Sequence, residues 1–210
     1  MVRRTPKPEG VPSKPRFKAA SKMDEPKPPR HVRLGALSSH IFLIEMDKGD
    51  SRTAAIVAAG LLEHNLAVVL LIRFRKLTNR QQKDLFEDQN SALNTFSAKI
   101  QIGFALNLYN SHVRDDLDAI RRIRNTFAHQ LDVSSFDHPE VRDECDSLFG
   151  PKYLSRTEGK PEVTDRRQRV LNTAAHLAAR FDLELKNPQR PPDARIFSYE
   201  TIGIFPERKP

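Results

Sequence analysis

Residues 52–74 are apolar on nearly every side of a helix, and this stretch constrains the fold more than any other part of the chain. A surface helix keeps its apolar residues in one stripe, whereas a helix that is apolar all round needs other elements on most of its sides. Small residues fill its first half and would let neighbouring helices approach closely: Ala54, Ala55, Ala58, Ala59 and Gly60. The longest apolar run, residues 66–72, is far shorter than the ~20 residues of a membrane-spanning helix. We therefore expect this helix at the centre of a soluble bundle, with no membrane contact.

Five further segments have apolar residues at helical spacing and could pack around this central helix. They span residues 77–88, 95–109, 111–130, 139–149 and 165–185, and a shorter element is expected at 34–46. Gly150 and Pro151 should end the fourth of them, which leaves residues 153–161 as a polar connection. The pattern predicts an all-α bundle of about five to seven helices. Its expected core residues are Ala55, Leu62, Leu66, Val69, Ile100, Phe104, Leu117, Ile120, Phe127, Leu177 and Phe181.

Composition divides the chain into a tail at 1–35, the helical domain at 36–186 and a proline-rich extension at 187–210. The tail holds ten Lys or Arg against three acidic residues, so it carries +7 of the chain's net +8. Because it has almost nothing apolar to bury, we expect it to be disordered. It is either a solvated extension or an arm that weakly binds nucleic-acid phosphates. The candidate contacts are Arg3, Arg4, Lys7, Lys14, Arg16 and Lys18.

Most kinds of catalytic or cofactor site lack their residues in this sequence. Cys145 is the only cysteine, so the chain can form neither an intrachain disulfide nor a C-x-x-C metal site. The seven histidines include no H-x-x-x-H or H-E-x-x-H pair, and the glycine-rich phosphate-binding loops are missing. We therefore expect no metal and no cofactor. The single cysteine and the lack of an apolar leader fit a cytoplasmic protein.

One basic residue interrupts the apolar stripe of the segment at 111–130. At about 100° per residue, Arg124 falls between Ile120 and Phe127, where a permanently charged guanidinium needs a carboxylate or several carbonyl partners. Glu63 is a carboxylate in the central helix, where it would need a cation as a partner. We therefore treat Glu63 and Arg124 as candidate buried partners. The alternative is that Glu63 lies on the one hydrated face of its helix.

Arg124 also opens the string RNTFAH, which resembles the Arg-polar-x-x-x-His signature of the HEPN helical domains. The wider sequence resembles the mannitol operon repressor family through DSRTAAIVAAGLLEHNL at 50–66, TFSAKIQIGFALNL at 95–108 and DDLDAIRRIRNTFAH at 115–129, followed by SSFDHPEV. This resemblance implies a bacterial, cytoplasmic regulator of transcription, a repressor without enzymatic activity. It would act mainly through protein–protein contacts, as a homodimer or with a regulatory partner protein. Glu63, Arg124 and Phe127 would then be structural.

The HEPN resemblance implies a different function, a metal-independent ribonuclease in which Arg124, Asn125 and His129 are catalytic. Histidine can carry a proton near neutral pH, and arginine can stabilise negative charge on a phosphorane. Arg124 and His129 are, however, about 140° apart on an ideal helix, so one copy of the helix does not bring them together. His129 could instead bind a free carbonyl at the helix end. The regulatory interpretation is favoured for these reasons.

Overall fold

Seven α-helices and no strand make up the part of the chain that the computed structural model describes, residues 49–159, 161–186 and 199. The helices are α2 (Ser51–Arg73), α3 (Asn79–Phe86), α4 (Phe96–Ala105), α5 (Ser111–His129), α6 (Pro139–Ser147), α7 (Gly150–Glu158) and α8 (Arg166–Lys186). The expectation of an all-α bundle of about five to seven helices is confirmed. The element expected at 34–46 and the basic tail lie outside the described residues, as does the C-terminal extension apart from Tyr199.

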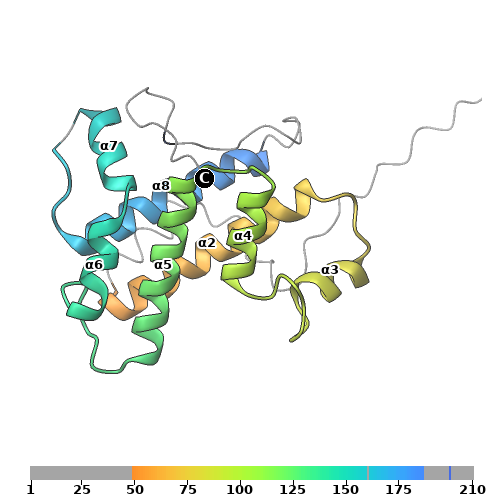
Figure 1. The fold of residues 1–210 in the computed structure, drawn as a ribbon, viewed down its shortest axis with the longest axis horizontal. Helices are drawn as coiled ribbons and strands as arrows, with labels where there is room; N and C mark the ends of the chain where they lie inside the picture. Colours follow the sequence, from red (N-terminus) through yellow and green to blue (C-terminus); the bar gives the residue numbers. More distant parts are fainter. Residues whose placement is uncertain (1–48, 160, 187–198, 200–210) are drawn as a thin grey trace, which may run out of the picture.

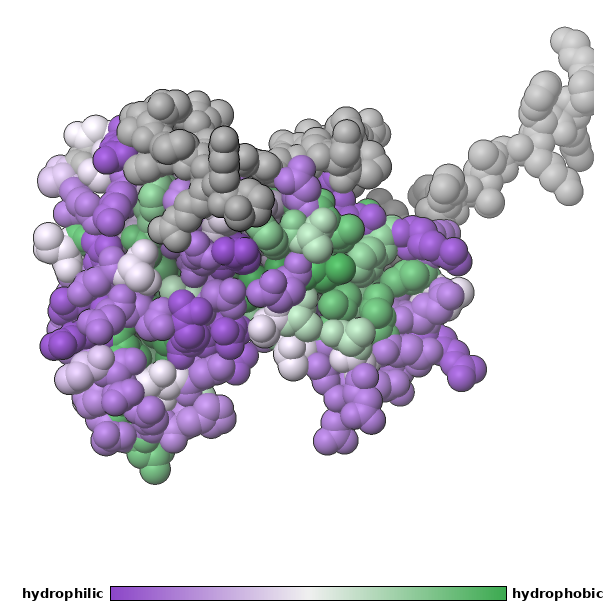
Figure 2. Space-filling model, in the orientation of Figure 1, coloured by the Kyte–Doolittle hydropathy of each residue, from purple (hydrophilic) through white to green (hydrophobic). Residues whose placement is uncertain are grey.

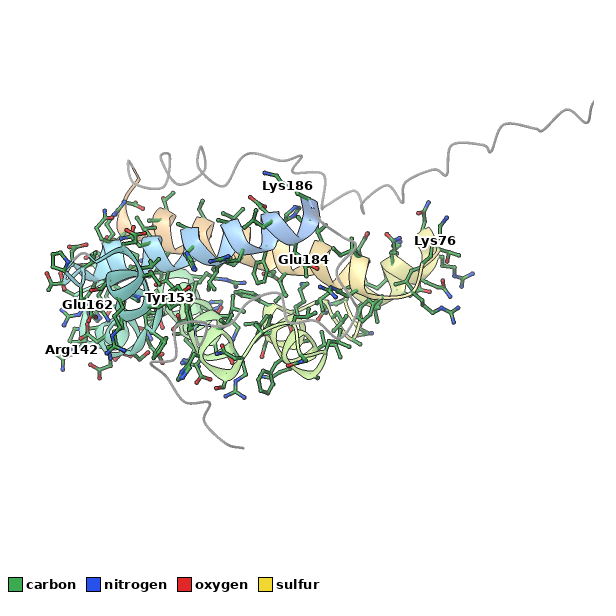
Figure 3. All side chains as sticks on the ribbon, turned by 90° about the horizontal axis from the view of Figure 1, so that it is seen from above. Lys76, Arg142, Tyr153, Glu162, Glu184 and Lys186 are labelled. Carbon is green, nitrogen blue, oxygen red and sulfur yellow. The ribbon has the colours of Figure 1, made fainter. Side chains whose placement is uncertain are left out.

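Two long helices, α2 and α8, lie side by side and run in the same direction (Figures 1 and 3). Polar contacts join them along their length. Arg167 donates to the Gly49 carbonyl at 2.7 Å near the N-terminal ends, and Arg73 pairs with Glu184 near the C-terminal ends. Helices α4 and α5 form a second layer over them, with α6 and α7 at one end and α3 at the other (Figure 1). The central position expected for α2 follows from its packing against α8, α5 and α4.

The core matches the sequence expectation at ten of its eleven residues, all of which are buried. The expectation for Phe104 is wrong, because its ring is only partly buried and the Arg114 guanidinium lies 4.6 Å from its centroid. Within α4, Gly103 leaves room for the ring of Tyr109, whose hydroxyl donates to the Ile100 carbonyl at 2.9 Å. A Cβ on Gly103 would overlap that ring, which explains a glycine inside a helix.

Among the described helices, α2 is the one that is long and apolar enough to cross a membrane by length and composition. Half of its most apolar window is buried inside the bundle. Two of its large apolar side chains remain well exposed, Ile56 at 40% and Ile72 at 39%. The face presented by α5 and α6 is mainly hydrophilic, whereas apolar side chains are visible around α4 (Figure 2).

The structure differs most from the sequence expectation at residues 150–161. Helix α6 already ends at Ser147, and Gly150 and Pro151 begin helix α7, so the expectation of a polar connection at 153–161 is wrong. Proline is favoured in the first turn of a helix because its missing N–H would be unpaired there anyway. Helix α4 also ends earlier than expected, at Ala105, since Asn107 adopts a left-handed conformation with φ of 55°.

Candidate functional site

The last turn of α5 carries the motif from Arg124 to His129, and its central aromatic residue anchors this turn in the core. Phe127 is buried and packs edge-on against Phe136, with 4.9 Å between ring centroids. Asn125 is partly exposed and His129 is exposed. Arg124 reaches away from this side of the helix toward α2, where it contacts Glu63. One subunit therefore does not bring Arg124 and His129 together.

Glu63 bridges two cations from neighbouring helices. Its Oε2 lies 3.3 Å from Nη2 of Arg124, and its Oε1 lies 2.7 Å from Nζ of Lys99. The expected contact with Arg124 is present, but the pair is not deeply buried, since 30% of the Arg124 side chain and 24% of the Glu63 side chain are exposed. The more buried partner is Lys99, at 7% exposed, which the sequence analysis missed. Lys99 also donates to the Asn94 carbonyl at 3.2 Å, so its ammonium group is held by two partners.

The backbone carbonyls at the end of α5 are bound by Arg52 of α2, and not by His129 as the helix-end interpretation expected. Arg52 donates to the carbonyls of Phe127, Gln130, Leu131 and Val133, the last three at 3.0, 3.1 and 3.0 Å. The last carbonyls of a helix have no partner within it, so these bonds satisfy groups that would otherwise need water. They also fix the turn after α5, in which the side chain of Leu131 is 89% exposed.

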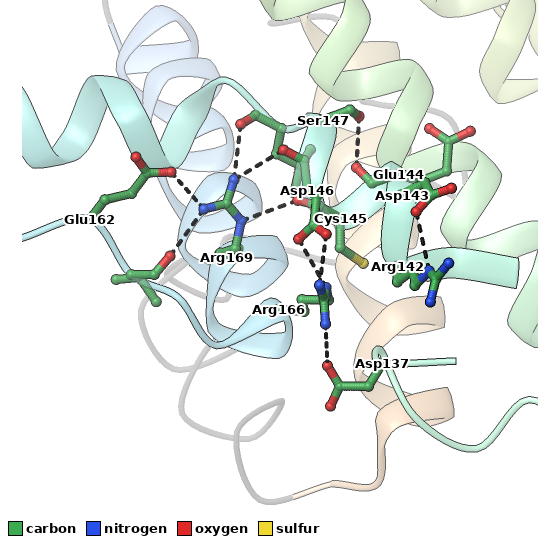
Figure 4. Close-up of polar contacts among 12 residues, drawn as sticks. Asp137, Arg142, Asp143, Glu144, Cys145, Asp146, Ser147, Glu162, Arg166 and Arg169 are labelled. Carbon is green, nitrogen blue, oxygen red and sulfur yellow. Dashed lines mark hydrogen bonds and ion pairs between the residues drawn. The ribbon is translucent and has the colours of Figure 1, made fainter. Parts of the chain in front are cut away.

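A second arginine performs the same task at the end of α6 (Figure 4). Arg169 of α8 donates to the carbonyl of Cys145 at 3.2 Å and to those of Asp146 and Leu148 at 3.3 and 3.5 Å. Arg166 lies beside it and binds the carboxylates of Asp146 and Asp137. Its hydrogen bonds hold the pKa of Asp146 below the usual value. The arginines at the start of α8 therefore serve the packing of α6 against α8.

A buried carboxylate with a raised pKa lies in the first half of α5. Asp116 is 1% exposed, and its carboxylate accepts from the backbone N–H groups of Phe149 at 2.7 Å and Gly150 at 2.9 Å. The hydroxyl of Tyr199 donates to it at 2.8 Å. Burial raises the pKa of Asp116 to about 6, although these three donors act in the opposite direction. No cation is among the hydrogen-bond partners that the structure describes for this carboxylate.

Aromatic rings surround this carboxylate and its tyrosine partner. The ring of Tyr199 lies 5.2 Å from that of Phe149 and 4.8 Å from that of Tyr153, centroid to centroid. Phe149 stacks on His112 at 4.1 Å, and Tyr153 lies 5.5 Å from His176. We call Asp116, Phe149, Gly150 and Tyr153 the Asp116 site. The helical spacing that drew attention to Arg124 could have found it, because Asp116 also falls on the apolar side of α5.

The described residues offer little for redox or metal chemistry. Among them, no group of three or more His, Cys, Asp or Glu side chains is placed to hold a metal ion. Cys145 is buried, and burial raises the pKa of its thiol to about 12, so the thiolate is scarce near neutral pH. The six candidate nucleic-acid contacts of the tail, from Arg3 to Lys18, lie outside the described residues.

The fold is similar to that of a chain in the X-ray structure of the MtlR–HPr complex from Escherichia coli. The match has a TM-score of 0.54 and covers 68% of this chain and 97% of that chain, at 16% sequence identity. No family model matches the sequence, and no curated protein matches it either. At this identity the similarity establishes the architecture alone. The chain therefore has a helical fold of the mannitol-repressor type.

Proposed function

We propose that this protein is a non-enzymatic regulator that acts through protein–protein contacts, with a partner of the HPr type. The observation that carries the proposal is the fold shared with a chain of the MtlR–HPr complex. The geometry of the motif agrees with it. Arg124 is engaged by Glu63 and His129 is exposed at the end of α5, which supports a structural role for Arg124.

The turn after α5 is the surface on which we place this contact. Leu131 is the most exposed of the large hydrophobic residues in the described part of the chain. Arg52 binds the carbonyls of residues 130, 131 and 133, so the backbone beneath this leucine is already fixed before a partner arrives. A side chain presented on a fixed backbone loses less conformational entropy on binding than one on a loose loop.

Calorimetric titration of the full chain with Escherichia coli HPr tests this proposal. We expect saturable binding that Leu131→Ser weakens about tenfold, equivalent to ~1.4 kcal/mol. Leu183→Ser is the matched control, because Leu183 is 56% exposed but lies on α8, in the other layer. An equal loss of affinity in both variants would show that the turn after α5 is not the contact surface. Absence of binding at high HPr concentration would contradict the proposal of an HPr-type partner.

Regulation of transcription and self-association remain part of the proposal, together with a weak contact between the basic tail and nucleic acid. The charge of the tail, +7 within residues 1–35, supports the last of these. Binding of this kind should weaken steeply with salt and disappear when the six cations from Arg3 to Lys18 are replaced by glutamine. A full chain with these replacements that binds DNA or RNA unchanged at low salt would show that these six residues are not the contact, and would leave the other four cations of the tail or the helical domain.

A further inference from the structure

Several contacts that hold the Asp116 site are made within the bundle and do not involve Tyr199. Asp116 is fixed by two backbone N–H groups at the start of α7, and Phe149 is held by its stacking on His112. Gly150 packs so closely on Thr173 of α8 that a Cβ there would overlap the threonine side chain. Helices α5, α7 and α8 therefore position the acceptor and one aromatic wall before any tyrosine enters.

Tyr199 reaches this site from far along the chain. It lies 13 residues beyond Lys186, where α8 ends, and it is the one residue of the C-terminal extension that the structure describes. Its side chain contacts the bundle through the hydroxyl bond to Asp116 and through the rings of Phe149 and Tyr153. The side chain is 1% exposed. A phenol thus has its ring between aromatic groups and its O–H on a carboxylate, which are the two things it needs when buried.

We propose that the Asp116 site is a docking site for a tyrosine side chain presented by a peptide segment, and that Tyr199 occupies it as an intramolecular ligand. A segment with the same chemistry, supplied by a partner protein, would bind by displacing Tyr199. Without Tyr199, Asp116 keeps both backbone donors, so the vacated site still has an oriented acceptor. This inference does not depend on the proposed HPr-type partner, because the two surfaces share no residue.

The covalent tether sets the strength of the competition. Tyr199 belongs to the same chain as the site, so its effective concentration there is on the order of millimolar, and a free peptide must exceed this concentration or bind more tightly than Tyr199. Wild-type protein should therefore resist the free peptide, and removal of the Tyr199 side chain should reveal the site.

The test uses the full chain and a fluorescein-labelled peptide with the sequence of residues 194–204, ARIFSYETIGI. By fluorescence anisotropy, we expect this peptide to bind the Tyr199→Ala protein at least about ten times more tightly than wild type. The same peptide with phenylalanine in place of its tyrosine should bind the variant about tenfold more weakly, since Asp116 then loses its hydroxyl donor. Exchange of the Gly150 N–H with deuterium should slow on peptide binding.

Three results would overturn the proposal. Equal affinity for the wild-type and Tyr199→Ala proteins would place the peptide elsewhere. A folded Tyr199→Ala protein that binds no peptide would make Tyr199 a dedicated packing residue. A Tyr199→Ala protein that fails to fold, judged by circular dichroism, would do the same, because a displaceable ligand cannot be essential to the fold.

Discussion

The two halves of α5 place their charged groups in very different surroundings. Near the N-terminal end, Asp116 is buried, and its described hydrogen-bond donors are neutral. Near the C-terminal end, Arg124 is 30% exposed on the side chain and pairs with a carboxylate that a second cation also holds. The Arg-polar-x-x-x-His pattern lies in the second half. The more unusual electrostatic environment lies in the first.

The motif that is easiest to recognise in the sequence is therefore not the part of α5 that contributes most to stability. A partly exposed ion pair is weakened by water, and its removal leaves groups that can be hydrated. A buried acceptor with three donors has no such alternative, because removing it leaves each donor unsatisfied. Substitution of Asp116 should therefore lower the free energy of unfolding several times more than substitution of Arg124.

The largest effect is expected for Asp116→Ala. It strands the N–H groups of Phe149 and Gly150 and the hydroxyl of Tyr199, and should lower the free energy of unfolding by roughly 3–5 kcal/mol. Urea denaturation measures this change. Asp115→Ala is the matched control, since Asp115 is partly exposed and should cost less than about 1 kcal/mol. Similar losses of unfolding free energy for Asp116→Ala and Asp115→Ala would show that the buried carboxylate contributes no more than an exposed one.

The second prediction concerns pH. The pKa of Asp116 is raised from 3.8 to about 6, so between these values the folded protein holds a proton that the unfolded chain releases. Raising the pH through this interval should lower the free energy of unfolding, by up to about 3 kcal/mol for Asp116 alone. His176 acts in the opposite direction. Burial lowers its pKa from 6.5 to about 4, so it stabilises the fold increasingly as the pH rises through that range.

Substitutions should therefore reveal two opposing slopes that largely cancel in the wild type. With Asp116→Asn, the free energy of unfolding should rise from pH 4 to 6.5, because the His176 contribution remains. With His176→Gln, it should fall between pH 4 and 6. Urea denaturation at half-unit pH intervals gives both slopes. If the free energy of unfolding changed with pH in the same direction in both variants, Asp116 and His176 could not be the two opposing groups.

Smaller effects are expected around Glu63. Glu63→Gln removes the carboxylate that holds Lys99, whose side chain is 7% exposed, and should cost about 1–3 kcal/mol. Arg124→Ala leaves the Glu63–Lys99 pair intact and should cost about 0.5–1 kcal/mol, as expected for a partly exposed pair. Thermal denaturation of both variants and of the double mutant measures the coupling. A loss of about 3–5 kcal/mol for Arg124→Ala would indicate a fully buried pair.

His129→Ala should have the smallest effect, within about 0.5 kcal/mol, because this side chain is exposed and Arg52 already binds the carbonyls at the helix end. Arg52→Ala is the informative comparison and should cost about 2 kcal/mol or more through its lost carbonyl bonds. We also expect no cleavage of single-stranded RNA by wild type in excess EDTA. Cleavage that disappears with His129→Ala would favour the ribonuclease alternative.

Local pattern was enough to predict most of the helices and the core. Asp50 and Thr95 are residue types that favour helix starts, and they cap α2 and α4. The 3.6-residue spacing identified the buried side of α5. Contacts made over long sequence separations could not be read in this way. Arg52 binds carbonyls 75 to 81 residues away, and Lys99 reaches Glu63 across 36 residues. Nothing next to these residues in the sequence indicates such partners.

The parallel pairing of α2 with α8 has a consequence for biosynthesis. Its polar contacts join residues 111 to 118 positions apart, so α2 cannot complete its packing until nearly the whole domain has been made. Contacts of such separation also slow folding in general. At roughly 5–20 residues per second, α2 waits about 5–20 s for α8 to be synthesised. During this time the most apolar helix of the domain is a target for chaperones that bind nascent chains.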